Sequence, residues 1–322
     1  MAMASTAHPV NLRARAHARG ARFETLFRYA CGAAATALLG AMAGVCILLA
    51  IGGWPALSTF GVGFFTSTIW NPVTDIYGGA GPILGTLITS AIALVLALPL
   101  AFCTAVFLTE FCPQLLRRPI GIAVELLAGI PSIVYGMWGL FVFAPLFAEY
   151  IETPLMSWAK PGTFWETLFS GVANGSGVMT ASVILAIMIL PYIAATLREL
   201  FLSIPVRVRE SAYGMGCTPL EVIWSVTVPY VRRSAIGAVM LGLGRALGET
   251  MAVTFVIGNS HRLPRGIFDS GATISSTIAN EFAEATSEMH TSALLALGFV
   301  LFLITFVVLA AARALLGHGH SA

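Results

Sequence analysis

The sequence has few charged residues and almost no lysine. Charged side chains make up 10% of the 322 residues, hydrophobic side chains make up 57%, and the mean hydropathy is +0.87. A soluble chain of this length would carry roughly a quarter charged residues, so the composition predicts an integral membrane protein. The single lysine, Lys160, precedes a proline. A P-loop needs Gly-Lys-Ser/Thr to hold nucleotide phosphates, so ATP-driven work would require a separate ATPase subunit.

Features of disulfide-bonded, metal-binding and hydrolytic proteins are also missing. No Cys/His spacing is typical of a metal site, and we expect no cofactor. None of the cysteines lies in a segment that we place outside the membrane on the extracytoplasmic side, so no structural disulfide is expected. An intramembrane serine protease would need a base beside a nucleophile such as Ser176. We expect no histidine inside a membrane span, which argues against that enzyme class.

Long apolar segments predict six transmembrane helices, because about 20 apolar residues cross a bilayer as a helix. The predicted fold is therefore an all-α membrane protein. We expect an Arg-rich tail over 1–28, an external segment over 52–80 with a turn at Trp54-Pro55, a core over 81–316 containing five of the spans, and a tail over 317–322. The predicted spans are 29–51, 81–108, 120–148, 177–197, 234–258 and 291–315.

The basic residues orient these spans. Thirteen arginines fall on one side of the predicted topology and only three basic residues on the other. Because Lys and Arg accumulate in cytoplasmic loops, both termini and the loop 198–233 should be cytoplasmic. The basic residues on the opposite side are Lys160, Arg262 and Arg265. The remaining one, Arg245, belongs to neither side.

Arg245 and Glu249 form a candidate charged pair inside the fifth predicted span. Arg245 should lie roughly 17 Å deep, near the bilayer midplane, and Glu249 should follow one turn later on the same helix face. Ionisable residues at that depth face protein or water rather than lipid. The pair could line an anion path, or it could only fix helix packing. Gly244 and Gly248 would allow another helix to approach closely.

The loop between the fourth and fifth spans has the pattern of a compact helix–turn–helix. Thr218-Pro219-Leu220-Glu221 is a capping box with proline at the first helical position. Gly216 should adopt a positive φ between the two helices. Pro229 should stop or bend the second helix.

This loop resembles the coupling loop of ABC-transporter permease subunits. Glu210-Ser211-Ala212, then Gly216, then Val226-x-Val228-Pro229 match the family's spacing. Ser211 replaces the more usual alanine, and valines replace isoleucine and leucine. In that family the loop fits into a groove on the ATPase. The resemblance therefore implies a coupling role for Glu210, Ser211, Ala212, Gly216 and Pro229.

Two further stretches resemble permease subunits of the phosphate-specific ABC importer, of the C-type in particular. They are Gly242–Ala252, which includes Arg245 and Glu249, and Ile130–Gly136; Trp70-Asn71-Pro72 and Gly85-Thr86-Leu87 also fit. The resemblance implies the type I importer permease fold in a bacterial inner membrane. It also implies a heterodimer with a second permease, two copies of an ATPase subunit and a periplasmic phosphate-binding protein, with no nucleic acid among the partners.

Physics alone leaves alternatives open. An arginine binds sulfate, molybdate or phosphonate as readily as phosphate, and a passive anion channel could use Arg245 as a filter, although it would need no ATPase-docking loop. Glu125 could act in transport, helix packing or interfacial anchoring. The segment 149–176 should contain a short interfacial helix, and it could contact an extracytoplasmic partner.

Overall fold

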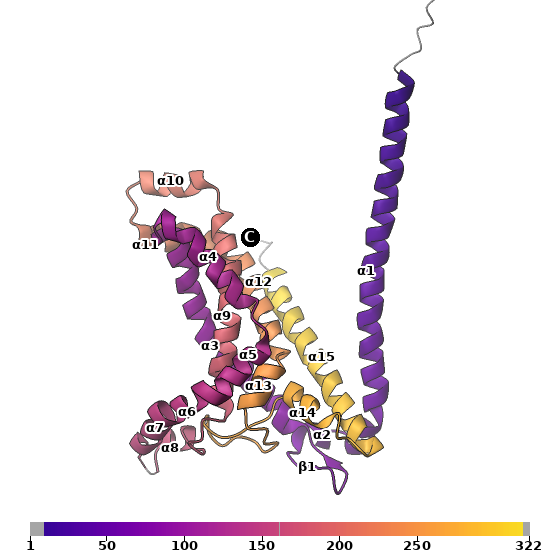
Figure 1. Cartoon of the computed structure of the whole chain (residues 1–322), viewed down its shortest axis with the longest axis vertical. Coiled ribbons are helices and arrows are strands. Elements are labelled where there is room, and N and C mark those ends of the chain that lie inside the picture. Colours follow the sequence, from indigo (N-terminus) through magenta and orange to yellow (C-terminus); the bar gives the residue numbers. More distant parts are fainter. Residues whose placement is uncertain (1–9, 161, 318–322) are drawn as a thin grey trace, which may run out of the picture. The chain divides into compact units, whose positions relative to one another are not determined.

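The computed structural model describes residues 10–160 and 162–317 and is predominantly helical (Figure 1). The terminal residues of both predicted tails, 1–9 and 318–322, lie outside the described part. The elements are α1 (Val10–Phe60), α2 (Gly63–Thr66), β1 (Trp70–Asn71), β2 (Ile76–Tyr77), α3 (Ala80–Val106), η1 (Phe107–Phe111), α4 (Gln114–Ala128), α5 (Ser132–Trp138), η2 (Gly139–Phe143), α6 (Ala144–Phe147), η3 (Ala148–Glu152), α7 (Thr153–Trp158), α8 (Phe164–Leu168), α9 (Val178–Leu202), α10 (Val206–Gly214), α11 (Pro219–Val222), η4 (Ile223–Thr227), α12 (Val228–Leu247), α13 (Met251–Val256), α14 (Ile274–Glu281) and α15 (Glu288–Gly317), where η denotes a π-helical turn.

The chain divides into two compact units, Met1–Ile51 and Gly52–Ala322. In the first unit the described residues form a single stretch of helix, and most of its side chains from Glu24 onward are exposed. Exposed leucines such as Leu38 and Leu39 are what a lipid-facing helix requires. The second unit contains the remaining helices and the candidate sites.

Five helical segments within the described residues are long and apolar enough to cross a membrane. They are Glu24–Phe60, Ala80–Phe111, Ser132–Trp158, Val178–Leu202 and Glu288–Ala314. Four of them coincide closely with predicted spans. The third is displaced along the chain, and the predicted fifth span is replaced by the two helices α12 and α13.

The third span begins later than predicted because the chain breaks before it. α4 ends at Ala128, and the helix resumes only at Ser132, after Pro131 with φ −57° and ψ 135°. A proline disfavours helical geometry in the residue before it, so Ile130-Pro131 separates two helices here. The predicted helix 120–148 was therefore wrong in its bounds. Residues 149–158 belong to the spanning helix, and α8 is the short helix expected within 149–176.

The first helix is longer than predicted because the turn at Trp54-Pro55 does not form. α1 continues through Pro55 to Phe60, and the hydroxyl of Thr59 donates to the Pro55 carbonyl at 2.8 Å. The chain turns at Gly61, whose φ of +52° suits a residue without a side chain. The stop signal is this glycine rather than the proline.

Closely packed small residues build the centre of the second unit. Four fully buried alanines recur every fourth residue along α3, at Ala93, Ala97, Ala101 and Ala105. They share a buried core with Ile189 and its neighbours on α9. Residues four apart lie on one helix face, and small side chains there let the backbones approach closely.

The two ends of this bundle carry different structures. Figure 1 shows α10 and α11 at one end, and the β1–β2 hairpin with α14 at the opposite end. The hairpin is antiparallel and pairs Trp70 with Tyr77. A second apolar cluster supports it, and there the Ala56 amide donates to the Ser292 hydroxyl at 3.0 Å.

Candidate functional site

Arg245 lies in the last turn of α12 without a carboxylate partner. No ion pair involves it in the described part of the chain. Its guanidinium carbon lies 5.9 Å from the centre of the Tyr192 ring on α9, and its Nε is buried with no hydrogen-bond partner. The contact with the ring face is favourable for a cation. The guanidinium therefore keeps hydrogen-bonding capacity that an anion could use.

Glu249 does not continue the helix of Arg245. α12 ends at Leu247, Gly248 caps it, and α13 starts only at Met251. The prediction that both charges lie one turn apart on a continuous helix was therefore wrong. Instead, Glu249 Oε1 accepts from the Ala252 amide at 3.4 Å, at the start of α13. A carboxylate at that position satisfies an otherwise free helical N–H.

The two stretches that carry the family resemblance meet at this break. Gly136 on α5 faces α13 so closely that a Cβ there would lie 3.0 Å from Ala252 Cα. Gly242 likewise faces α9, where a Cβ would lie 2.6 Å from Ile193 Cδ1. Among the described residues of this chain, no helix approaches Gly244 and Gly248 as closely as expected: Gly244 has only ordinary van der Waals space, and Gly248 is exposed.

The predicted helix–turn–helix is present as α10 and α11. Gly216 has φ +89°, as expected. The capping box also forms: the Glu221 amide donates to Thr218 Oγ1 at 3.4 Å, and the Thr218 amide donates to Glu221 Oε2 at 2.7 Å. The Thr218 hydroxyl also donates to Glu221 Oε2 at 2.9 Å, and the bonds that the Glu221 carboxylate accepts from the Thr218 amide and hydroxyl lower the pKa of Glu221. Local sequence rules are sufficient to specify this turn.

Pro229 does not end the second helix. The π-helical turn η4 precedes it directly, and α12 runs on from Val228. A proline removes one helical hydrogen bond and crowds the preceding turn, and a wider π turn is a common way to accommodate a local disturbance within a helix. α11, η4 and α12 thus connect the exposed loop directly to the segment that carries Arg245.

Two ion pairs near this loop were not predicted. Arg209 on α10 pairs with Glu110 on η1, and the Glu110 side chain is only 6% exposed. Burial, followed by the negative charge of Glu110, raises the pKa of the neighbouring Tyr213. Arg198 on α9 binds Glu125 on α4 at 2.9 Å. This contact gives Glu125 a helix-packing role, which was one of the alternatives left open.

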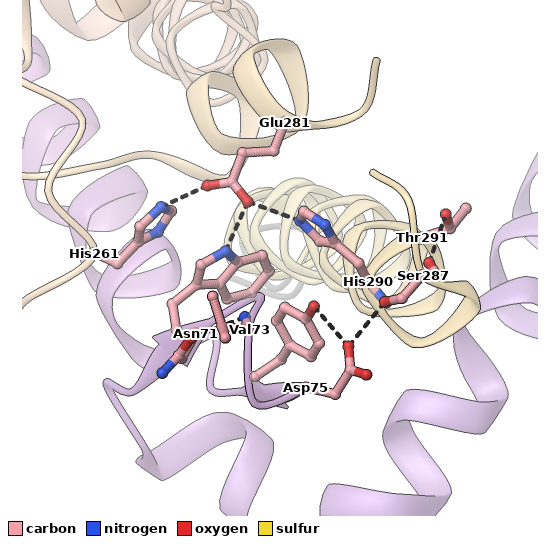
Figure 2. Close-up of polar contacts among 10 residues, drawn as sticks. Asn71, Val73, Asp75, His261, Glu281, Ser287, His290 and Thr291 are labelled. Carbon is pink, nitrogen blue, oxygen red and sulfur yellow. Dashed lines mark hydrogen bonds and ion pairs between the residues drawn. The ribbon is translucent and has the colours of Figure 1, made fainter. Parts of the chain in front are cut away.

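At the opposite end of the bundle, Glu281 joins four segments through one carboxylate (Figure 2). Trp70 Nε1 donates to its Oε2 at 2.7 Å, His261 Nε2 lies 2.7 Å from its Oε1, and His290 Nε2 lies 2.9 Å from its Oε2. The His261 ring stacks on Trp70 with 5.1 Å between centroids. We call Trp70, His261, Glu281 and His290 the Glu281 cluster.

The electrostatics of the Glu281 cluster favour the ionised carboxylate. Burial opposes ionisation, but hydrogen bonds from His261, Trp70 and His290 outweigh it and lower the pKa of Glu281. Below the cluster, Tyr77 and Ser287 both donate to Asp75 Oδ1, at 3.1 and 2.8 Å.

Sequence reasoning missed this cluster because its members are far apart in the chain. The only signal was the Trp70-Asn71-Pro72 motif, whose indole turns out to bind Glu281. His290 also corrects the expectation that spans contain no histidine, since it lies in the first turn of α15, inside the apolar segment Glu288–Ala314. It is far from Ser176 in sequence and is bound to Glu281.

Comparisons with known proteins agree with the resemblance. Residues 97–316 match the model of the family described as "binding-protein-dependent transport system inner membrane component". A protein of Mesorhizobium japonicum named phosphate transport system permease protein PstC is 53% identical over 298 residues, covering 92% of this chain and 91% of its own. The protein of the same name from Pasteurella multocida is 51% identical and covers 91% of each chain.

Solved structures show the same fold at low identity. A subunit of a bacterial ABC transporter involved in the import of the acidic polysaccharide alginate aligns with a TM-score of 0.58 and 15% identity, over 88% of this chain and 91% of its own. Together with the family match, which spans most of the chain, this identifies the fold as that of an ABC importer permease. The chain thus belongs to the family of binding-protein-dependent transport system inner membrane components.

Proposed function

We propose that the chain is the transmembrane permease subunit of an ATP-driven importer of inorganic phosphate. The observation that carries this proposal is the 50–53% identity, over about nine-tenths of the chain, to proteins named as phosphate transport permeases. The unpaired guanidinium of Arg245 is consistent with an anionic substrate. In this proposal Arg245 lies on the transport path and Glu249 shapes it by holding the start of α13.

The substrate can be tested by uptake in a strain that lacks the gene. Re-expression of the chain together with its partner subunits should restore uptake of labelled phosphate and leave sulfate uptake unchanged. Restored sulfate, molybdate or phosphonate uptake without phosphate uptake would assign a different oxyanion. Uptake that persisted without ATP hydrolysis would instead favour a passive channel.

We further propose that α10, Gly216 and α11 dock a separate ATPase. Large apolar side chains are exposed along this loop, including Met215 (79% exposed), Leu220 (62%) and Trp224 (61%). Exposed apolar groups of this size, bordered by the polar Glu210 and Ser211, are typical of a protein interface. The buried side chain of Ala212 packs α10 against the rest of the second unit. Pro229 lies where η4 passes into α12. The full assembly would add a second permease, two ATPase copies and an extracytoplasmic binding protein.

Gly216→Val should uncouple the permease from the ATPase. A β-branched residue is strained by more than about 1 kcal/mol at φ +89°, so the two short helices should change their relative orientation. We expect normal membrane insertion and loss of most ATPase co-purification and phosphate uptake. Gly214→Val is the matched control, because both glycines have open space around them and only Gly216 has a positive φ. Normal coupling in Gly216→Val would contradict the docking role.

The proposed location is a bacterial inner membrane, with both termini and the α10–α11 loop in the cytoplasm. Figure 1 shows α10 and α11 at one end of the bundle and β1 and α14 at the opposite end; β1 contains Trp70 and α14 ends at Glu281. A reporter enzyme that works only in the cytoplasm should be active when it is fused after Ala322. A cysteine introduced at Leu263 should react with an impermeant thiol reagent added from outside. A C-terminal reporter active only outside the cytoplasm would overturn this topology.

A further inference from the structure

A wide, open hollow lies beside the Glu281 cluster, and neither Arg245 nor Glu249 lines it. Its volume is about 1060 Å³. It lies between the segment that forms β1 and the loop after α13, and the polar groups lining it include Thr68, Asn71, Ser260, His261, Arg262 and Arg265. Figure 2 shows that His261 points from this loop toward Glu281.

The hollow has an excess of positive charge. Arg262 and Arg265 are exposed, and neither forms an ion pair with any residue that the structure describes. The lining contains one carboxylate, that of Asp269. Its oxygens accept hydrogen bonds from the Arg265 amide at 3.2 Å and the Ser270 amide at 3.0 Å. Glu281 does not line the hollow, and its carboxylate is hydrogen-bonded to Trp70, His261 and His290. Hydrogen bonds from neutral amides leave the charge of Asp269 in place, so the lining carries two guanidinium charges against one carboxylate charge.

Backbone contacts hold the arginine-bearing loop in place. The Ser260 amide donates to the Gly271 carbonyl at 2.9 Å, and the Gly271 amide donates to the Ile257 carbonyl at 3.0 Å. α3 packs directly against the loop, since a Cβ at Gly81 would lie only 2.0 Å from the His261 carbonyl oxygen. A loop whose backbone is fixed in this way needs little backbone ordering to bind a ligand, so the ordering cost falls mainly on the arginine side chains.

We propose that this hollow binds a small tetrahedral oxyanion of the phosphate class, with Arg262 and Arg265 as its ligands. Guanidinium groups form strong, forked hydrogen bonds with such anions, and amides and hydroxyls in the lining can supply further donors. The proposal rests on the proposed function, since it treats the anion as the transported substrate. The hollow would receive the anion at the end of the bundle opposite the α10–α11 loop, before it reaches Arg245.

Direct binding to the whole transporter tests this site. The complete nucleotide-free complex, without its binding protein, would be placed in nanodiscs of zwitterionic lipid and titrated with labelled inorganic phosphate. Arg262→Gln/Arg265→Gln should weaken binding at least about tenfold, the loss expected from removing charge-assisted hydrogen bonds. Arg262→Lys/Arg265→Lys should retain part of the affinity, which controls for misfolding. Lys160→Gln, which removes an exposed charge away from the hollow, should leave binding unchanged.

Three results would overturn the proposal: no phosphate binding by the wild-type complex, equal affinity in wild type and Arg262→Gln/Arg265→Gln, or loss of all binding in Arg245→Gln alone. Loss of binding-protein capture by the double Gln variant, with unchanged phosphate affinity, would assign the arginines to a protein contact and also overturn it. The phosphate-uptake experiment is independent. Uptake by wild type without a binding signal would refute only the hollow, whereas binding without phosphate uptake would refute the proposed function.

Discussion

Arg245→Gln is expected to abolish measurable phosphate uptake while leaving the complex assembled. The guanidinium has a buried Nε without a hydrogen-bond partner and forms no ion pair with any residue that the structure describes. A charged hydrogen bond to an anion contributes about 1.5–3 kcal/mol, and its loss at a narrow point of the path would reduce the flux at least about tenfold. Uptake in whole cells and co-purification of the subunits would be measured side by side.

Conservative variants separate a role in transport from a role in packing. Arg245→Met retains a long apolar stem beside Tyr192 but has no charge, so it should assemble normally and fail to transport. Arg245→Lys retains the charge without the planar fork and should transport partially. Tyr192→Phe keeps the ring face, so its assembly and phosphate uptake should be nearly normal. If Arg245→Met supported normal uptake, Arg245 would have only a packing role.

The structure changes the expectation for Glu249. Glu249 accepts a hydrogen bond from the Ala252 amide at the start of α13 and forms no ion pair with Arg245 in the described part of the chain. Since Glu249→Gln retains an acceptor oxygen, it should reduce phosphate uptake less than Arg245→Gln does. Arg245→Gln/Glu249→Gln should show no mutual rescue. Recovery of assembly and uptake together in the double variant would mean that the two charges pair in some state of the transporter, and would contradict the assignment of Arg245 to the transport path.

Composition and local rules predicted much of the fold. The apolar runs located most of the spanning helices, and the short-range signals around Thr218 and Gly216 predicted the capping box and the positive φ correctly. These features depend on residues that are only a few positions apart. A hydrogen bond between Thr218 and Glu221 forms wherever the helix starts, whatever packs against it.

Predictions that depended on tertiary context were less accurate. Proline alone cannot distinguish a break from a tolerated kink: the chain breaks before Pro131, continues through Pro55, and passes Pro229 directly after a π turn. The helix carrying Arg245 ends at Leu247 with Gly248 as its C-cap, and α13 begins only at Met251, a break that helical periodicity does not signal. The Glu281 cluster contains a hydrogen bond between residues 211 positions apart, which no local pattern reports.

Glu281→Ala is expected to destabilise the end of the molecule that contains the hairpin. The substitution leaves the indole N–H of Trp70 and the imidazoles of His261 and His290 without their shared acceptor. Each unsatisfied, partly buried polar group costs about 1–3 kcal/mol, so the unfolding temperature of the complex should fall by several degrees. Glu281→Gln keeps the size of the side chain and one acceptor oxygen. Its unfolding temperature should therefore lie between those of wild type and Glu281→Ala.

The difference in unfolding temperature caused by substituting Glu281 should also depend on pH. The pKa of Glu281 is lowered in the folded state, so its carboxylate contributes stability that is fully present above the ordinary glutamate value of about 4.3. This contribution is lost as the pH falls through the lower folded-state pKa. The difference in unfolding temperature between wild type and Glu281→Gln should therefore shrink as the pH falls below about 4.

Glu284→Gln is the matched control for this series, because Glu284 is exposed and lies three residues beyond Glu281 on the same segment. It should leave both the unfolding temperature and its pH dependence unchanged. Equal unfolding temperatures for wild type and Glu281→Ala at neutral pH would show that the carboxylate does not hold the four segments together. A difference that grew as the pH fell below about 4 would contradict the lowered pKa, since protonation of Glu281 should make wild type and Glu281→Gln more alike.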